Sequence, residues 1–236
     1  MKSTLRNMVV VLCGITVITA LLVAVVNNMT KDAIEQSKIN AKNAAKFKVV
    51  GVDDSQAYVS RDTTRTIGDF NITVSTVVSK ADDSIVGYAV EAPSILKSGY
   101  SDRIYLMVGF VEREGVTSVC DIEVLSQKET PGLGANMERE DNSLIRSIVG
   151  RDMSTVVFNV TKKDKDATFD ALTGSTISSM AYVNAVETAY AGYLWATGQL
   201  NMDEEAIEAA PSGASVAHDD SYNEEPEAQK GDVDNE

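Results

Sequence analysis

The feature that most constrains this chain is an apolar run near its beginning. Met8 to Val26 holds 19 consecutive residues without a charged side chain. At about 1.5 Å per residue, a helix of this length spans roughly 28 Å, close to the hydrocarbon thickness of a bilayer. The alternative is a cleaved signal peptide, but Leu22 stands two residues before the small Ala24, where a cleavage site needs a small side chain. We therefore expect an uncleaved transmembrane helix over residues 8–26.

The charges on either side of this helix bear on its orientation. Lys2 and Arg6 precede the helix, and four lysines with two acids follow it: Lys31, Lys38, Lys42 and Lys46, with Asp32 and Glu35. The charge count alone does not decide, but a short basic head before the first apolar segment is typical of a signal anchor. We expect a single-pass protein of the cell inner membrane, with residues 1–7 in the cytoplasm and the large domain on the periplasmic side.

The remaining sequence predicts an α+β fold in which a mainly antiparallel sheet is packed by helices. Residues 27–50 predict a connecting helix with Thr30 as its N-cap, and further helices are predicted from Asn142 or Ser143 to Ile148 and over Ile177–Ala196. One face of the last helix is expected to pack on the sheet through Val183, Val186, Tyr190 and Leu194. Runs rich in Val, Ile, Thr and Tyr, most of them joined by hairpin-length turns, predict the strands Ile72–Val78, Ile85–Ala92, Ile104–Val111, Val116–Leu125 and Thr155–Val160. The charged segment 162–166 is expected to form a turn after the last of these strands. One domain is expected over residues 51–200.

Charge is spread unevenly along the chain. The formal net charge is −14, and residues 201–236 hold 12 acidic residues against the single basic Lys230. This tail has few large apolar residues, so we expect it to be disordered and solvated. Nucleic acid is excluded as a partner because binding needs clustered Lys and Arg facing the phosphates.

Two scarce residue types limit the chemistry that side chains alone can perform. The only histidine is His218, in the acidic tail, so catalytic triads and histidine-built zinc sites have no histidine in the folded domain. Cys13 and Cys120 are far apart in sequence and form no CxxC pair. No catalytic side chain and no metal site is expected, and redox work would need a bound cofactor.

One segment suits an anion. Asp170 to Ser179 reads DALTGSTISS and runs directly into the long C-terminal helix. Free N–H groups and the positive end of the helix dipole would hold a phosphate there, with further hydrogen bonds from the hydroxyls of Thr173, Ser175, Thr176 and Ser178. The alternative is a plain N-cap, a role in which Ser and Thr are favoured anyway.

A second segment, Glu129 to Gly134, reads ETPGLG. Pro131 fixes φ, and the two glycines free the backbone to turn tightly or to approach a ligand closely. Most such stretches are turns. Leu133, between the two glycines, is expected to be exposed, which a plain turn does not explain.

Together with the anchor and the segment 99–101 (GYS), these motifs resemble a known family. The chain resembles the FMN-binding subunits of bacterial membrane-bound electron-transport complexes, most closely the G subunits of Rnf complexes. The resemblance covers residues 1–200 and implies that the phosphate of FMN is attached to the hydroxyl of Thr176. It also implies that the flavin lies close to residues of both loops: Thr173, Gly174, Ser175 and Ile177, and Glu129, Thr130, Gly132 and Leu133.

The resemblance further implies partners and a role. A separate magnesium-dependent flavin transferase, with FAD as donor, would attach the flavin. Other subunits of an ion-translocating oxidoreductase would exchange electrons with it and couple the transfer to ion movement. Two alternatives stay open: the C subunit of a sodium-translocating NADH:quinone reductase, and a membrane-anchored binding or scaffold domain without a cofactor.

Overall fold

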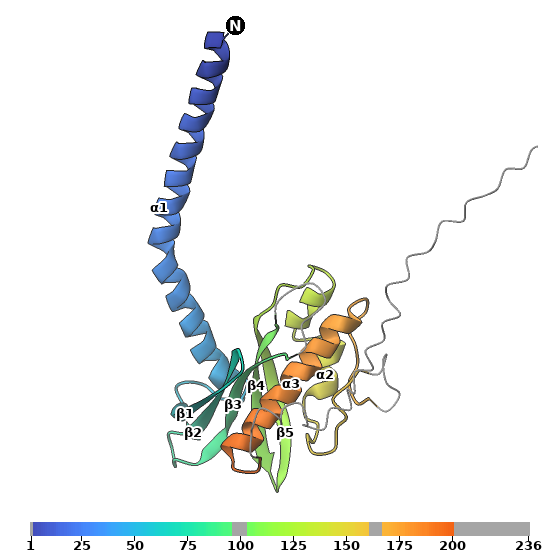
Figure 1. Ribbon diagram of the computed structural model, residues 1–236. Helices are drawn as coiled ribbons and strands as arrows, with labels where there is room; N and C mark the ends of the chain where they lie inside the picture. Colours follow the sequence, from blue (N-terminus) through green and yellow to red (C-terminus); the bar gives the residue numbers. More distant parts are fainter. Residues whose placement is uncertain (1, 96–102, 161–166, 201–236) are drawn as a thin grey trace, which may run out of the picture.

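The computed structural model describes residues 2–95, 103–160 and 167–200. One helix, α1 (Lys2–Lys48), contains both the apolar run and the predicted connecting helix. It projects from the domain (Figure 1). The large apolar side chains from Met8 to Val26 are exposed. Within the described ranges, Arg6–Lys48 is the one helix long and apolar enough to cross a membrane. Its length, composition and exposure support a single membrane anchor.

The prediction that Thr30 caps a separate helix was wrong. Thr30 lies inside α1, where its Oγ1 donates a hydrogen bond to the carbonyl of Val26 over 2.9 Å. The segment between Val26 and Lys48 contains no Pro or Gly, so nothing in the sequence interrupts the helix at the end of the apolar run.

A five-stranded antiparallel sheet follows α1, and its strands lie in the order of the sequence. The strands are β1 (Ala57–Ile67), β2 (Phe70–Ser79), β3 (Ile85–Pro93), β4 (Tyr105–Arg113) and β5 (Val116–Ser126). This confirms the α+β class, the antiparallel pairing and the hairpins predicted after β2 and β4. Strand β1 was missed because it is a polar edge strand, in which only Ala57 and Ile67 are buried and no apolar alternation is visible.

One face of the sheet carries the larger core. It packs against α3 (Thr176–Ala196), with α2 (Ser143–Ile148) and the 3₁₀ helix η1 (Gly134–Glu138) beside it (Figure 1). Val183 and Val186 are buried in this core as predicted. More of α3 is buried than the face predicted from the sequence. A Cβ at Gly192 would lie 2.6 Å from Ile72 Cγ2 of β2, so this glycine also packs closely on the sheet. The helix is therefore packed on more than one face, with Leu144 and Phe158 in the same core.

The other face of the sheet receives the end of α1. Ala45 and Val49 are buried there in a second, smaller core. A Cβ at Gly109 of β4 would lie only 1.8 Å from the carbonyl oxygen of Val49, so glycine is required for this close approach. Lys46 also pairs with Asp62 of β1 over 2.9 Å. These contacts join the membrane anchor directly to the sheet.

The last predicted strand is wrong. Thr155–Val160 forms only an isolated bridge between Val160 and Phe169, and the segment supports the core through the buried Phe158 instead. Three sequence interpretations lie outside the described residues: the segment 99–101, the turn at 162–166 and the tail at 201–236.

Candidate functional site

The two loops singled out from the sequence lie against each other. Ser178, in the first turn of α3, donates a hydrogen bond from its Oγ to Oε2 of Glu129 over 2.7 Å, and both side chains are buried. A Cβ at Gly134 would lie 2.7 Å from each of these two oxygens. Because Cβ atoms do not approach other atoms so closely, glycine at this position allows the first loop to close on the helix.

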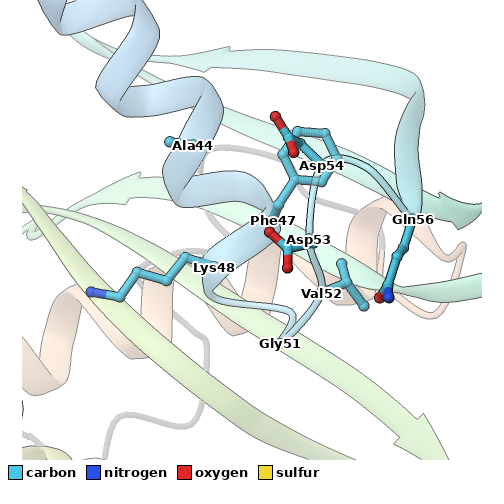
Figure 2. A pocket seen from close by; sticks show the side chains of 8 residues that line it. All are labelled: Ala44, Phe47, Lys48, Gly51, Val52, Asp53, Asp54 and Gln56. Atoms are coloured by element: carbon cyan, nitrogen blue, oxygen red, sulfur yellow. The ribbon is translucent and has the colours of Figure 1, made fainter.

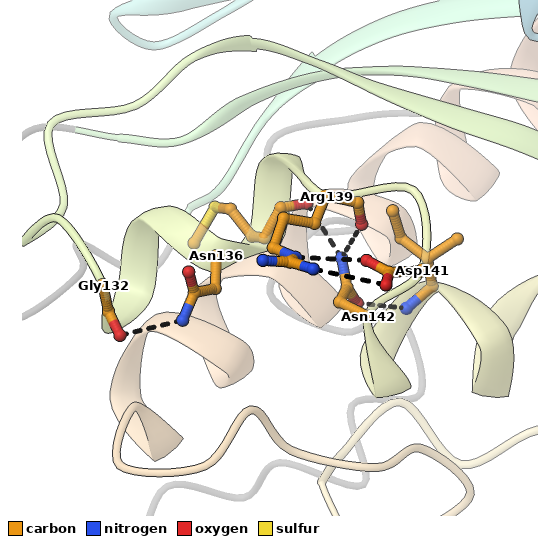
Figure 3. Close-up of polar contacts among 7 residues, drawn as sticks. Gly132, Asn136, Arg139, Asp141 and Asn142 are labelled. Carbon is orange, nitrogen blue, oxygen red and sulfur yellow. Dashed lines mark hydrogen bonds and ion pairs between the residues drawn. The ribbon is translucent and has the colours of Figure 1, made fainter.

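Backbone hydrogen bonds hold the ETPGLG loop in a tight turn. Gly132 has φ +78°, a conformation that glycine adopts without strain. The N–H groups of Leu133 and Ala135 donate to the carbonyl of Thr130 over 3.1 and 3.3 Å. The Asn136 side-chain amide donates to the Gly132 carbonyl over 2.8 Å (Figure 3). The loop is thereby fixed at both its centre and its exit.

Asn142 fixes the segment that follows this loop. Its Oδ1 accepts a hydrogen bond from the N–H of Ile145 over 2.8 Å, which makes Asn142, one of the two predicted candidates, the N-cap of α2. Its Nδ2 donates to the carbonyls of Met137 and Arg139 over 3.1 and 2.6 Å (Figure 3). One buried side chain therefore joins the end of η1 to the start of α2.

The start of α3 is built differently, because the side chain at its N-cap position does not cap it. Ser175 occupies the N-cap position, but its hydroxyl makes no capping hydrogen bond. The backbone ladder of the helix begins with the N–H of Ser179, which donates to the Ser175 carbonyl over 3.0 Å. The backbone N–H groups of Thr176, Ile177 and Ser178 precede this bond and make no hydrogen bond within the described ranges, so they are left for another acceptor. The alternative reading of this loop as a plain capping motif is therefore not what the structure shows.

The hydroxyls of this second loop fall into two groups. The hydroxyl of Ser179 is buried and used, donating to the Ser175 carbonyl over 2.8 Å and accepting from the N–H of Leu172 over 2.9 Å. Thr176 is half-buried and Thr173 is exposed, and neither hydroxyl makes a hydrogen bond within the part of the chain that the structure describes. Thr176 thus offers a free hydroxyl at the helix start.

Two apolar side chains are exposed beside this helix start. Leu133 is 46% exposed, as predicted, and Ile177 is 50% exposed. A Cβ at Gly174 would lie 3.3 Å from Leu133 Cδ2, so Leu133 reaches across to the second loop. Gly174 has φ +76°, which lets the chain turn sharply just before the helix.

These residues fit the cofactor implied by the resemblance. Open N–H groups and the positive end of α3 suit a phosphate, and the free Thr176 hydroxyl suits its attachment. The exposed Leu133 and Ile177 offer apolar surface to a flat ring system. The buried carboxyl of Glu129 accepts a hydrogen bond from the Ser178 side chain. The open N–H groups make no hydrogen bond to the residues that the structure describes, so they stay available to the phosphate.

The structure brings together most of the residues predicted for the site. Glu129 and Leu133 contact residues of the second loop, Thr130 and Gly132 form the turn between them, and Gly174 to Ile177 form the start of α3. Sequence reasoning gave the Ser178 hydroxyl to the anion, whereas it is used by Glu129. It missed Asn136, whose bond to Gly132 is local but follows from no motif that the sequence reasoning used. It also missed the close approach at Gly134, which depends on tertiary contacts with Glu129 and Ser178.

Two hollows of the described surface lie away from the two loops. One of about 580 Å³ lies beside the end of α1 (Figure 2) and is lined by Ala44, Phe47, Lys48, Gly51, Val52, Asp53, Asp54 and Gln56. Another of about 390 Å³ lies between α1 and the strands, and is lined by Lys38, Ala41, Lys42, Glu91, Tyr105, Glu123, Val124, Leu125 and Ser126. Neither is lined by residues of the two loops.

Two parts of the chain match known protein families. Residues 99–191 match the FMN-binding domain family, and residues 1–46 match the RnfG N-terminal region. The first of these matches includes the ETPGLG loop and the start of α3.

The chain is also similar to components of known complexes. It is 31% identical over 176 residues to the G subunit of the ion-translocating oxidoreductase complex of Salmonella typhimurium, covering 71% of this chain and 81% of that protein. The corresponding protein of Erwinia tasmaniensis is 31% identical over 196 residues, covering 79% and 89%. The G subunit of the Na⁺-translocating ferredoxin:NAD⁺ oxidoreductase complex of Acetobacterium woodii is 25% identical over 182 residues, covering 75% and 85%. The chain therefore belongs to the RnfG family, the G subunits of ion-translocating oxidoreductase complexes, and carries that family's FMN-binding domain.

Proposed function

We propose that this protein relays electrons within an ion-translocating oxidoreductase complex, as its G subunit, through FMN bound by a phosphoester to Thr176. The observation that carries the attachment site is the uncapped start of α3, where three N–H groups and a free threonine hydroxyl lie together. A phosphodiester keeps a negative charge, and this charge is stabilised by open N–H groups and the positive end of the helix.

The bound flavin supplies one- and two-electron redox chemistry, and the chain supplies its position and surroundings. The N–H groups of Thr176, Ile177 and Ser178 would bind the phosphate oxygens. Leu133 and Ile177 would exclude water from the ring, and the bond between Glu129 and Ser178 would keep the two loops together. Covalent attachment at the start of a buried helix prevents loss of the carrier.

The membrane topology and the partners of the chain are also proposed. Residues 1–7 would lie in the cytoplasm, 8–26 in the membrane and the flavin domain, 51–200, on the periplasmic side. There a magnesium-dependent flavin transferase would attach the flavin, with FAD as donor. The matched relatives are G subunits, which favours an Rnf-type complex over the C subunit of a quinone reductase. The match to the FMN-binding domain counts against a scaffold without cofactor.

The attachment site is tested by co-expressing the full chain with a flavin transferase and examining denaturing gels for flavin fluorescence. The unmodified chain should fluoresce, and Thr176→Ala should not. Thr173→Ala is the matched control, because this threonine lies in the same loop with an equally free hydroxyl, and this variant should keep its fluorescence. Fluorescence that persists in Thr176→Ala and disappears in Thr173→Ala would move the attachment to Thr173.

The membrane orientation is tested separately. Protease added to intact spheroplasts should degrade the domain and leave a short fragment containing residues 1–26. If the domain survives while a periplasmic marker is degraded, the orientation is the reverse of the one proposed.

A further inference from the structure

A buried carboxyl on α3 has no role in the site described so far. We propose that Glu187 is a proton-binding site, and that its occupancy is linked to the charge carried at Thr176. The linkage rests on the proposed flavin attachment, whereas the proton site itself does not. The ligand is a single proton, exchanged with solvent, and its release converts the carboxyl of Glu187 into a carboxylate.

The first observation is that one carboxyl oxygen of Glu187 is buried without a partner. The residue is only 8% exposed, and Oε1 makes no hydrogen bond. The other oxygen, Oε2, accepts a hydrogen bond from Nδ2 of Asn184 over 3.3 Å. A buried carboxylate with an unsatisfied oxygen is costly, whereas the protonated carboxyl needs only modest solvation. The surroundings therefore favour the form that carries the proton.

The second observation is the position of Glu187 on α3. Thr176, Met180, Asn184 and Glu187 are spaced by four, four and three residues, so they share one face of the helix. Eleven residues of helix place Glu187 roughly 16 Å along the axis from Thr176. A charge added at Thr176 therefore acts on Glu187 along the surface of a single helix, with much of the intervening space filled by buried protein.

The third observation concerns the charged groups on neighbouring elements. Asn184 Oδ1 accepts from the N–H of Ile95, just after β3, over 2.7 Å. Beyond Ile95 lies the Arg103 guanidinium, which donates to the Ile95 carbonyl over 3.3 Å and pairs with Asp69 over 2.9 Å. No lysine or arginine forms an ion pair with Glu187 among the residues that the structure describes.

The titration behaviour agrees with this geometry. Burial raises the pKa of Glu187 from 4.5 to about 7, opposed only in part by the hydrogen bond from Asn184. The proton is therefore bound and released near neutral pH. Coupling between two sites is reciprocal, so negative charge gained at Thr176 must strengthen proton binding at Glu187, and proton binding must favour that gain of charge.

The proton site is tested without flavin, in the full-length Thr176→Ala chain in detergent. Because the folded chain binds a proton that the unfolded chain has lost, stability should fall as pH rises from 4.5 to about 7 and then level off. The measurement is the urea midpoint at each pH. Adding Glu187→Gln, which keeps the shape without the charge, should abolish that fall, whereas Glu35→Gln on the exposed part of α1 should leave it.

An infrared spectrum measures the protonation of the Glu187 carboxyl without unfolding the chain. At pH 6 the Thr176→Ala chain should show a protonated carboxyl band that is absent after Glu187→Gln. If the midpoints of the two chains change with pH in the same way and the band is unchanged, Glu187 is not a proton site. That outcome would leave the proposed flavin attachment untouched.

The linkage is tested in the flavin-loaded chain. Attachment adds the negative charge of a phosphodiester at Thr176, so the protonated carboxyl band of Glu187 should persist to higher pH in the loaded chain than in the flavin-free Thr176→Ala chain. The infrared band is followed from pH 6 upward in both chains, and Glu187→Gln in the loaded chain identifies it. A band that is lost at the same pH in both chains would overturn the linkage, while the stability measurements still decide the proton site.

Discussion

Two helices of this domain begin in opposite ways. At the start of α2, the Asn142 side chain caps the N–H of Ile145 and also holds two carbonyls of the preceding turn. At the start of α3, the Ser175 side chain caps nothing. Both positions are occupied by good capping residues. The difference shows that the side-chain geometry of the N-cap, and not its residue type, separates a structural helix start from one left open for a ligand.

The surroundings of the two starts explain why each can persist. Asn142 is buried, so unpaired groups beside it would have no water to bind. The N–H groups at the start of α3 lie beside the half-exposed Thr176 and the exposed Ile177, where solvent or a phosphate can satisfy them. The open start therefore costs little in the free chain, and it gains when an anion binds.

The largest effect is expected from removing the cap of α2. Asn142→Ala leaves the N–H of Ile145 and the carbonyl of Met137 unpaired at a buried position, while the carbonyl of Arg139 keeps its bond from the backbone N–H of residue 142. The loss should lower the free energy of unfolding by roughly 2–3 kcal/mol. Asn142→Asp keeps the acceptor for Ile145 but loses the two donated bonds, so its loss should be smaller. Urea unfolding of the full chain in detergent measures both. An alanine variant as stable as the parent would remove the contrast between the two helices.

A smaller effect is expected where α3 meets the ETPGLG loop. Ser178→Ala removes the hydroxyl that donates to Glu129, and should cost about 1–2 kcal/mol because the carboxyl stays buried. A double-mutant cycle with Glu129→Ala, which removes the acceptor, measures the pairwise contribution. The two substitutions should be non-additive. Strict additivity would mean that the loops are held together by other contacts.

Introducing a cap at the start of α3 should make it resemble α2. Ser175→Asp places a carboxylate beside the open N–H groups and should stabilise the flavin-free chain by about 0.5–1 kcal/mol. The same carboxylate would compete with a phosphate for those groups, so the fraction of chains that become fluorescent with the transferase should fall. Ser175→Asn, a cap without charge, separates competition for the N–H groups from charge repulsion. Full loading of both variants would show that the open N–H groups are not needed.

The smallest effect is expected from Ser175→Ala. Because the hydroxyl makes no capping bond, its removal should change the free energy of unfolding by no more than about 0.5 kcal/mol. The measurement is the same urea titration, run beside Asn142→Ala. A loss as large as that of the α2 variant would show that Ser175 does cap the helix in solution.

Much of this fold follows from the sequence because its signals are local. The apolar runs of β2 to β5 and the spacing in α3 each identify an element, and Asn142 lies directly before the helix that it caps. Strand β1 was missed because an edge strand with two buried residues has no such pattern. The site was predictable in its loops but not in its contacts. The pairing of Glu129 with Ser178 joins residues 49 apart, and the sequence gives no reason to prefer it over solvent.

The uninterrupted helix α1 fixes the orientation of the domain relative to the apolar run. Because Val49 is fixed against Gly109, the angle at which the domain faces its neighbours depends on the number of residues after the membrane. One residue inserted between Val26 and Lys48 would turn the domain by about 100° and raise it by about 1.5 Å. Seven would raise it by about 10 Å yet restore its heading to within about 20°. The length of α1 after the apolar run therefore sets both the orientation of the domain about the helix axis and its distance from the membrane.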